Sequence, residues 1–94
     1  MFYYLYVLQS LKDGKFYTGI TSDLRKRLKE HNSGKNISTS YRRPLKLVYY
    51  AAYLLKKDAE AREKYLKTSM GKRVLKKQLA NFLKSKKTST HLKS

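Results

Sequence analysis

The chain has 94 residues, of which 23 are Lys or Arg and 6 are Asp or Glu, giving a formal net charge of +17. This length allows one domain with a single small core. A field this positive excludes cationic partners and favours polyanions, with nucleic acid first and an anionic membrane surface second. The 40% of hydrophobic and 13% of aromatic residues are too many for a disordered basic tail, so we expect the chain to fold.

The sequence also lacks the marks of a secreted or membrane protein. It has no cysteine, which excludes a disulfide framework, a thiolate nucleophile and a cysteine-ligated zinc site. The apolar run at 2–8 is too short to cross a membrane, and it lacks the basic flank and cleavage site of a signal peptide. We therefore expect a cytoplasmic protein that does not enter a membrane.

Two strands joined by a hairpin are predicted at the start of the chain. Residues 2–8 are aromatic and branched throughout, which is typical of a strand buried on both faces. The Asp-Gly pair at 13–14 favours a tight hairpin turn, so residues 15–20 should form a second, antiparallel strand. This hairpin would bring Tyr6 and Tyr17 side by side.

A helix is predicted next. Residues 21–23 provide hydroxyl and carboxylate groups for its N-terminal cap, and residues 32–34 end it with a glycine. Leu24, Leu28 and His31 fall at i, i+4 and i+7, so we expect them on one face of this helix.

An exposed loop and a third strand are predicted in the middle of the chain. Residues 35–43 are polar, basic and rich in Ser and Thr, which indicates a loop. Residues 45–54 indicate a strand, and simple alternation places five side chains on one of its faces: Leu45, Leu47, Tyr49, Ala51 and Tyr53.

Two helices and a tail complete the chain. The first of these two helices is expected to be capped by Asp58 and broken by Gly71. Its inward stripe is formed by Ala59, Glu63, Leu66 and Met70. The second helix is predicted at 72–83, and residues 85–94 should form a basic, disordered tail. The predicted fold is α+β: a small three-stranded antiparallel sheet flanked by helices, in the order β-β-α-β-α-α, within a single domain over 1–84.

Several of these residues suit the hydrolysis of a phosphodiester. Glu63 shares the apolar face of its helix, so its carboxylate is either half-buried and paired or a metal ligand. Arg27 and His31 lie one helical turn apart, close in sequence to the two hairpin tyrosines. Hydrolysis needs a base for the water, a cation for the phosphorane charge and a hard metal for the leaving oxygen.

The spacing of these residues resembles the GIY-YIG endonuclease domain family, most of all its small stand-alone bacterial members. Tyr4-Leu5-Tyr6 and, after ten residues, Tyr17-Thr18-Gly19 are similar to the paired motif that names the family. The sequence departs from the motif where Tyr and Leu replace its first Gly and Ile, and where Thr replaces its second Ile. The segment 19–27 with His31 is similar to the family's glycine-to-helix segment, and 59–63 resembles the helix that carries its glutamate.

The resemblance, which covers residues 2 to about 83, implies a metal-dependent endonuclease acting on DNA. Glu63 would hold one Mg²⁺ or Mn²⁺ as the only protein ligand, an arrangement that magnesium accepts because it keeps its waters. Arg27 would neutralise the charge that develops on the phosphorane. Branched or flapped DNA in repair or recombination is the substrate that the resemblance favours.

The remaining site residues are also implied by the resemblance. Tyr6 would orient or deprotonate the attacking water, and His31 would relay its proton. Tyr17 would bond the water or a phosphate oxygen, and Gly19 would let the backbone turn closely past the site. The residues expected to contact nucleic-acid phosphates are Arg25, Lys35, Arg42 and Arg43.

Other interpretations stay open at this point. The two tyrosines can also be interpreted as ordinary strand aromatics. His31 can be interpreted as an imidazole at a helix C-terminus, and Glu63 as the partner of Lys67 at i+4. At the level of function, the alternatives are a non-catalytic nucleic-acid-binding module with the same fold and, less favoured, a membrane-surface protein. A protein partner that supplies specificity, and a monomer or a weak dimer, are compatible with the sequence.

Overall fold

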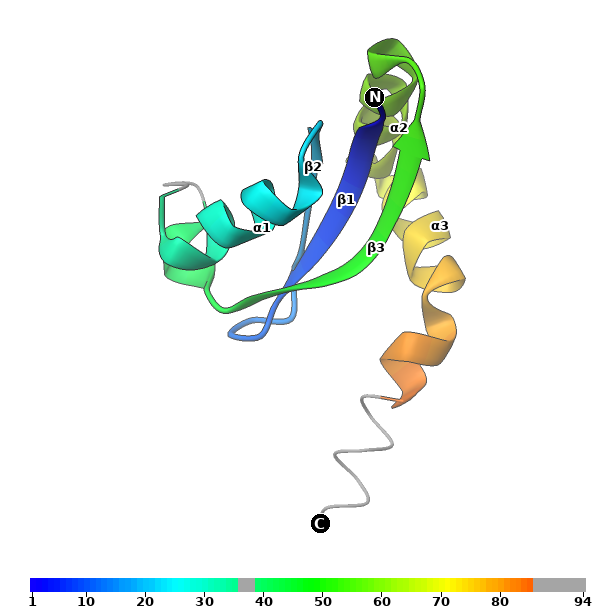
Figure 1. Cartoon of the computed structure of the whole chain (residues 1–94). Coiled ribbons are helices and arrows are strands. Elements are labelled where there is room, and N and C mark those ends of the chain that lie inside the picture. Colours follow the sequence, from blue (N-terminus) through cyan, green and yellow to red (C-terminus); the bar gives the residue numbers. More distant parts are fainter. Residues whose placement is uncertain (36–38, 86–94) are drawn as a thin grey trace. The chain divides into compact units, whose positions relative to one another are not determined.

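The structure, a computed structural model of the chain, describes residues 1–35 and 39–85 (Figure 1). It confirms the α+β class and the predicted order of elements. The elements are β1 (Tyr3–Ser10), β2 (Phe16–Thr21), α1 (Leu24–Ser33), the 3-10 turn η1 (Ser40–Arg42), β3 (Leu45–Tyr53), α2 (Lys56–Leu66) and α3 (Ser69–Gln78).

The chain divides into two compact units between Glu63 and Lys64. The first unit contains the whole sheet, α1 and the first two turns of α2. The predicted single domain over 1–84 stays a prediction, and most of the predicted tail, 86–94, lies outside the described residues. In the described part of the chain, no helix has the length and apolar character needed to cross a membrane.

The central strand of the sheet is β1, which pairs antiparallel with β2 on one side and β3 on the other (Figure 1). Leu5 and Val7 on one face and Leu8 on the other are all at most 1% exposed, so β1 is buried on both faces as predicted. The predicted hairpin turn is confirmed too, because Gly14 has a φ of 75°, a value that favours glycine.

The first helix, α1, begins and ends where the sequence indicates. The Asp23 carboxylate accepts a hydrogen bond from the backbone N–H of Lys26 at 3.1 Å, and Gly34 ends the helix with a φ of 84°. Leu24 and Leu28 pack against a core cluster formed by Tyr6, Leu8 and Leu45. This packing holds α1 against the sheet face that carries Tyr6.

A β-bulge divides β3 into two halves. Leu47 pairs with Leu8 of β1, but the next residue of β1, Val7, pairs with Tyr49. Val48 is therefore the extra residue on β3, and the alternation of side chains is interrupted there.

The bulge makes the prediction of one continuous face on β3 wrong. Leu45 and Leu47 lie on the face that α1 covers, where they join the core cluster. Beyond the bulge, the opposite face carries Tyr49, Ala51 and Tyr53, the partners of Val7, Leu5 and Tyr3. As a result, Tyr50 lies directly opposite Tyr6, on the same face as Tyr6.

The boundaries of α2 and α3 also differ from the prediction. Asp58 lies in the first turn of α2 rather than at its cap, and Met70 belongs to α3, where it is 60% exposed. Gly71 does not break a helix, because it lies inside α3 and its N–H donates to the Thr68 hydroxyl that caps α3. A Cβ at Gly71 would collide with the backbone carbonyl of Tyr65, and this close approach explains the glycine.

Deletion of Val48 is expected to leave a folded protein, because it removes the extra residue and keeps Leu47 opposite Leu8. Its cost should be about 1–2 kcal/mol, roughly the contribution of a partly buried valine. Deletion of Ala51, the matched control, can keep Leu47 opposite Leu8 only if the bulge closes, and it then moves Tyr49 opposite Tyr6 and Tyr50 opposite Leu5, which turns both side chains onto the other face. We expect a higher urea midpoint for the first deletion than for the second; equal loss of stability in both would contradict the bulge.

Candidate active site

The phenol of Tyr6 lies over Gly19 of the neighbouring strand. The two residues are direct cross-strand partners, and a Cβ added at Gly19 would lie 2.5 Å from the Tyr6 hydroxyl oxygen. Gly19 lies within β2, and the described glycines with positive φ are Gly14 and Gly34. The prediction of a backbone turn at Gly19 is therefore wrong. Glycine is needed there because the Tyr6 ring occupies the space of a side chain.

A buried chain of hydrogen bonds begins at Tyr6. Its hydroxyl forms a hydrogen bond of 3.0 Å with Nε2 of His31 on α1. Nδ1 of His31 forms a hydrogen bond of 2.8 Å with the hydroxyl of Thr39, just before η1. His31 and Thr39 are both 0% exposed. The structure thus brings Tyr6 and His31 together. Thr39 was missed because it lies in a polar loop whose sequence does not distinguish it from its neighbours.

Burial keeps the Tyr6 phenol and the His31 imidazole neutral near pH 7. It raises the pKa of Tyr6 to about 12, with a further upward contribution from Tyr17 and a smaller one from Glu63, while Arg27 acts in the opposite direction. Burial also lowers the pKa of His31 from 6.5, and the charge of Arg27 lowers it further. In the folded protein, a neutral phenol therefore faces a neutral imidazole.

Tyr17 lies on the same sheet face as Tyr6, one step along the strand. It pairs with Leu8, two residues from Tyr6, so the two tyrosines are diagonal rather than directly opposite neighbours. Both rings meet His31 edge to face, with centroid distances of 5.2 Å for Tyr17 and 5.7 Å for Tyr6. The imidazole is thereby held between the two phenols.

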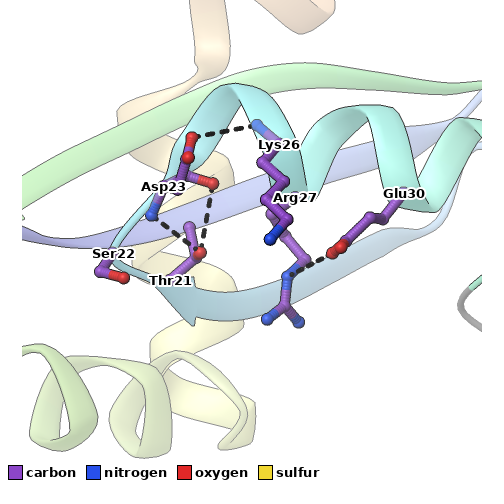
Figure 2. Close-up of a pocket in the computed structure, with 6 residues that line it drawn as sticks. All are labelled: Thr21, Ser22, Asp23, Lys26, Arg27 and Glu30. Carbon is purple, nitrogen blue, oxygen red and sulfur yellow. Dashed lines mark hydrogen bonds and ion pairs between the residues drawn. The ribbon is translucent and has the colours of Figure 1, made fainter.

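Arg27 lies at the edge of this site, beside a shallow pocket of about 150 Å³ at the start of α1. Its Nε is 3.3 Å from a carboxylate oxygen of Glu30, and Figure 2 shows the two side chains meeting along the helix. The i, i+3 spacing of Arg27 and Glu30 on one helix favours this pair. The pocket is lined by Thr21, Ser22, Asp23, Lys26, Arg27 and Glu30.

Glu63 lies half-buried on α2, and its negative charge raises the pKa of Tyr6. It is thus close enough to the phenol for the two groups to interact. Among residues 1–35 and 39–85, no three His, Cys, Asp or Glu side chains gather in a way that could hold a metal ion. The one carboxylate at hand, that of Glu63, fits a hard cation such as Mg²⁺ that keeps most of its water ligands.

The four basic residues expected to bind phosphates differ in their surroundings. Arg25, Lys35 and Arg43 are exposed, as phosphate binding requires. Arg42 is half-buried, and its Nε lies 3.6 Å from the carboxylate of Asp13 at the hairpin turn. This contact between the turn and η1 favours a structural role for Arg42 over the predicted phosphate contact.

The free energy of unfolding should decrease as the pH falls below about 6.5, because unfolding releases a histidine that protonates more readily than buried His31. The sign follows from the lowered pKa: the stabilisation is complete above 6.5 and is lost between 6.5 and the folded pKa. The slope for one proton is at most about 1.4 kcal/mol per pH unit. Urea unfolding between pH 7.5 and 5 measures it, and a His31→Gln variant with the same slope would contradict the prediction.

Replacing Gly19 with Ala should push the Tyr6 phenol away from His31, at a cost of about 1–3 kcal/mol for overpacking. Side-chain ¹⁵N NMR should then show a shift of the His31 ring nitrogens. The control is Gly14→Ala, where the new methyl group meets no atom within 4 Å and the strain is confined to the backbone. A His31 spectrum that is unchanged in Gly19→Ala would show that the two rings do not depend on this glycine.

Comparisons with known proteins agree with this geometry. The chain matches the model of the GIY-YIG catalytic domain over residues 2–78. UPF0213 proteins of Bacillus pumilus and Streptococcus pneumoniae are each 45% identical to it, over 70% and 68% of this chain. The matches span 67% and 65% of those relatives, so the chain covers about two thirds of their length.

A solved structure shows the same relationship. The solution NMR structure of a UPF0213 protein from Bacillus halodurans is 38% identical, has a TM-score of 0.50, and is matched over 87% of this chain and 85% of that one. The family match covers most of the chain and includes every strand of the sheet and the residues around Tyr6. The chain therefore belongs to the GIY-YIG catalytic domain family, a family of nuclease domains.

Proposed function

We propose that this protein is an endonuclease that hydrolyses phosphodiester bonds in DNA with the help of one Mg²⁺ or Mn²⁺ ion. The observation that carries the proposal is the buried 3.0 Å contact between the Tyr6 hydroxyl and His31 Nε2, beside the guanidinium of Arg27. A phenol joined to a neutral imidazole can take a proton from water and pass its own proton on. At a site that binds phosphate, such a pair can activate the water that attacks phosphorus.

The proposed proton path runs through the two groups whose pKa is shifted by burial, Tyr6 and His31. With Nδ1–H of His31 donating to Thr39, Nε2 is the acceptor of the Tyr6 hydroxyl proton. Attacking water would give its proton to Tyr6 as Tyr6 gives its own to His31, and the resulting hydroxide would bond to phosphorus as the bond between phosphorus and the leaving sugar oxygen breaks. No lasting phenolate is needed, which agrees with a pKa of about 12 for Tyr6.

The charge that develops on the phosphate would be balanced from two sides. Glu30 pairs with Nε of Arg27 and so helps to orient the guanidinium, which would then bind phosphate oxygens. Glu63 would hold the divalent ion, and that ion, when bound, stabilises the charge on the leaving oxygen. Tyr17, on the other side of His31, would hydrogen-bond the water or a phosphate oxygen.

The surface charge supports a nucleic-acid substrate. A net charge of +17 on 94 residues gives an attraction to phosphates that does not depend on sequence. Selectivity for branched or flapped DNA in repair or recombination would then come from DNA shape or from a protein partner. We propose a monomer or weak dimer acting in the cytoplasm.

The proposal predicts that Arg27→Ala and Glu63→Ala each reduce cleavage by about 10²–10³-fold, the usual loss when one stabiliser of transition-state charge is removed. The measurement is cleavage of branched, single-stranded and duplex DNA with Mg²⁺ or Mn²⁺. Matched controls are Lys29→Ala and Glu60→Ala, exposed residues of the same charge on the same helices, which should cut like the parent.

Two results would count against an endonuclease. One is a purified protein that cuts none of these substrates, and the other is an Arg27 or Glu63 variant as active as the parent. If the inactive protein still bound DNA, about 10³–10⁵-fold more weakly at 200 mM than at 50 mM salt, the non-catalytic binding module would be the better description.

A further inference from the structure

A second groove adjoins the pocket of Arg27, and the proposed reaction does not use it. It has a volume of about 440 Å³, and Ser22 and Asp23 at the start of α1 line both hollows. The leucines of its apolar wall are Leu24, Leu28 and Leu47, and its other lining side chains include Tyr4, Arg25 and Tyr50.

The aromatic side of this groove depends on the bulge in β3. Because Val48 is the extra residue, Tyr50 lies directly opposite Tyr6, with a Cβ separation of about 4.5–5.5 Å. The Tyr6 ring lies over Gly19, on the side of β1 away from β3. The groove therefore begins beside the candidate active site without being filled by Tyr6.

Tyr50 is 54% exposed although it is a large aromatic residue beside an apolar wall. Its ring meets the ring of Tyr4 edge to face at 6.1 Å, and Phe2, 46% exposed, continues the aromatic row at 6.5 Å from Tyr4. The exposed ring of Tyr50 is a platform for stacking, and the occupant must present a flat apolar face of its own.

Charge narrows the choice of occupant. Arg25 lines the same groove, and the protein as a whole carries a charge of +17, so the occupant combines a flat apolar ring with negative charge. A nucleotide has both. Inside a duplex, however, each base is stacked between its neighbours, so only a base that has left the stack offers a free face.

We infer that the groove between Tyr4, Arg25 and Tyr50 binds an unstacked nucleobase next to the phosphate that is cut. The inference rests on the proposed function, because it takes Arg27 as the place of that phosphate. The two hollows share Ser22 and Asp23, so a strand passing the start of α1 would place a base in the groove and an adjoining phosphate at Arg27. The base would stack on Tyr50, and Arg25 would bind a neighbouring phosphate.

The test measures binding in EDTA, so that no cleavage occurs. One probe is a single-stranded DNA of about ten nucleotides, within the site sizes of single-strand binders, and the other is the same backbone without any bases. We expect the parent to bind the first strand about 5- to 160-fold more tightly, the fold-change for one base stacked on an aromatic ring. Both strands carry the same phosphates, so the difference isolates the base.

Three variants locate the effect. Tyr50→Ala should bind the two strands almost equally, whereas Tyr50→Phe keeps the ring and should keep the preference. Tyr41→Ala removes a tyrosine on η1 that is 69% exposed and does not line the groove, so it should behave like the parent. Equal thermal unfolding of the four proteins excludes a folding defect as the cause.

The inference is overturned if the parent binds the two strands equally, or if Tyr50→Ala keeps the preference that Tyr41→Ala shows. The result is independent of the cleavage experiment. If the protein prefers the base-containing strand but cuts no DNA, the proposed reaction is contradicted and the base-binding groove stands. If it cuts DNA but shows no such preference, the base-binding groove is contradicted and the proposed reaction stands.

Discussion

The phenol of Tyr6 lies over Gly19 and ends at His31, and this single packing contact joins β1, β2 and α1. The space above the glycine is what allows a ring on the central strand to reach the helix. His31 is fixed in turn by Thr39 and by the ring of Tyr17. The core of the first unit and the proposed proton path are therefore built from the same atoms, so packing and chemistry depend on each other.

Charge and neutrality are separated in this small protein. The buried chain of Tyr6, His31 and Thr39 carries no net charge near pH 7, because burial opposes both the phenolate and the imidazolium. The positive charge comes from the 23 cationic side chains of the whole sequence. Two of them, Arg25 and Arg27, line the pockets beside the buried chain of hydrogen bonds. A polyanion would thus be attracted by the positive charge of the whole protein and would meet the neutral pair of Tyr6 and His31 at the candidate active site.

Local sequence signals predicted the hairpin, the caps of α1 and the antiparallel sheet, because each depends on a few neighbouring residues such as Gly14, Asp23 and Gly34. The resemblance to a family supplied Tyr6, His31 and Arg27, which the fold then brought together. Three features escaped because they depend on distant atoms: Thr39 contacts a helix eight residues before it, Gly19 is explained by a ring on another strand, and the bulge appears only when β3 is paired with β1.

The bulge at Val48 decides which tyrosine of β3 lies beside Tyr6. Before Val48 the strand contributes leucines to the interior under α1, and after it the same face carries Tyr50 beside the candidate active site. Without the bulge, the same sequence would keep Leu47 opposite Leu8 but would place Tyr49, and not Tyr50, opposite Tyr6, while β1 and its tyrosine stayed in place. The position of one bulge therefore selects the side chain that lines the groove, with Tyr6, Tyr17 and His31 untouched.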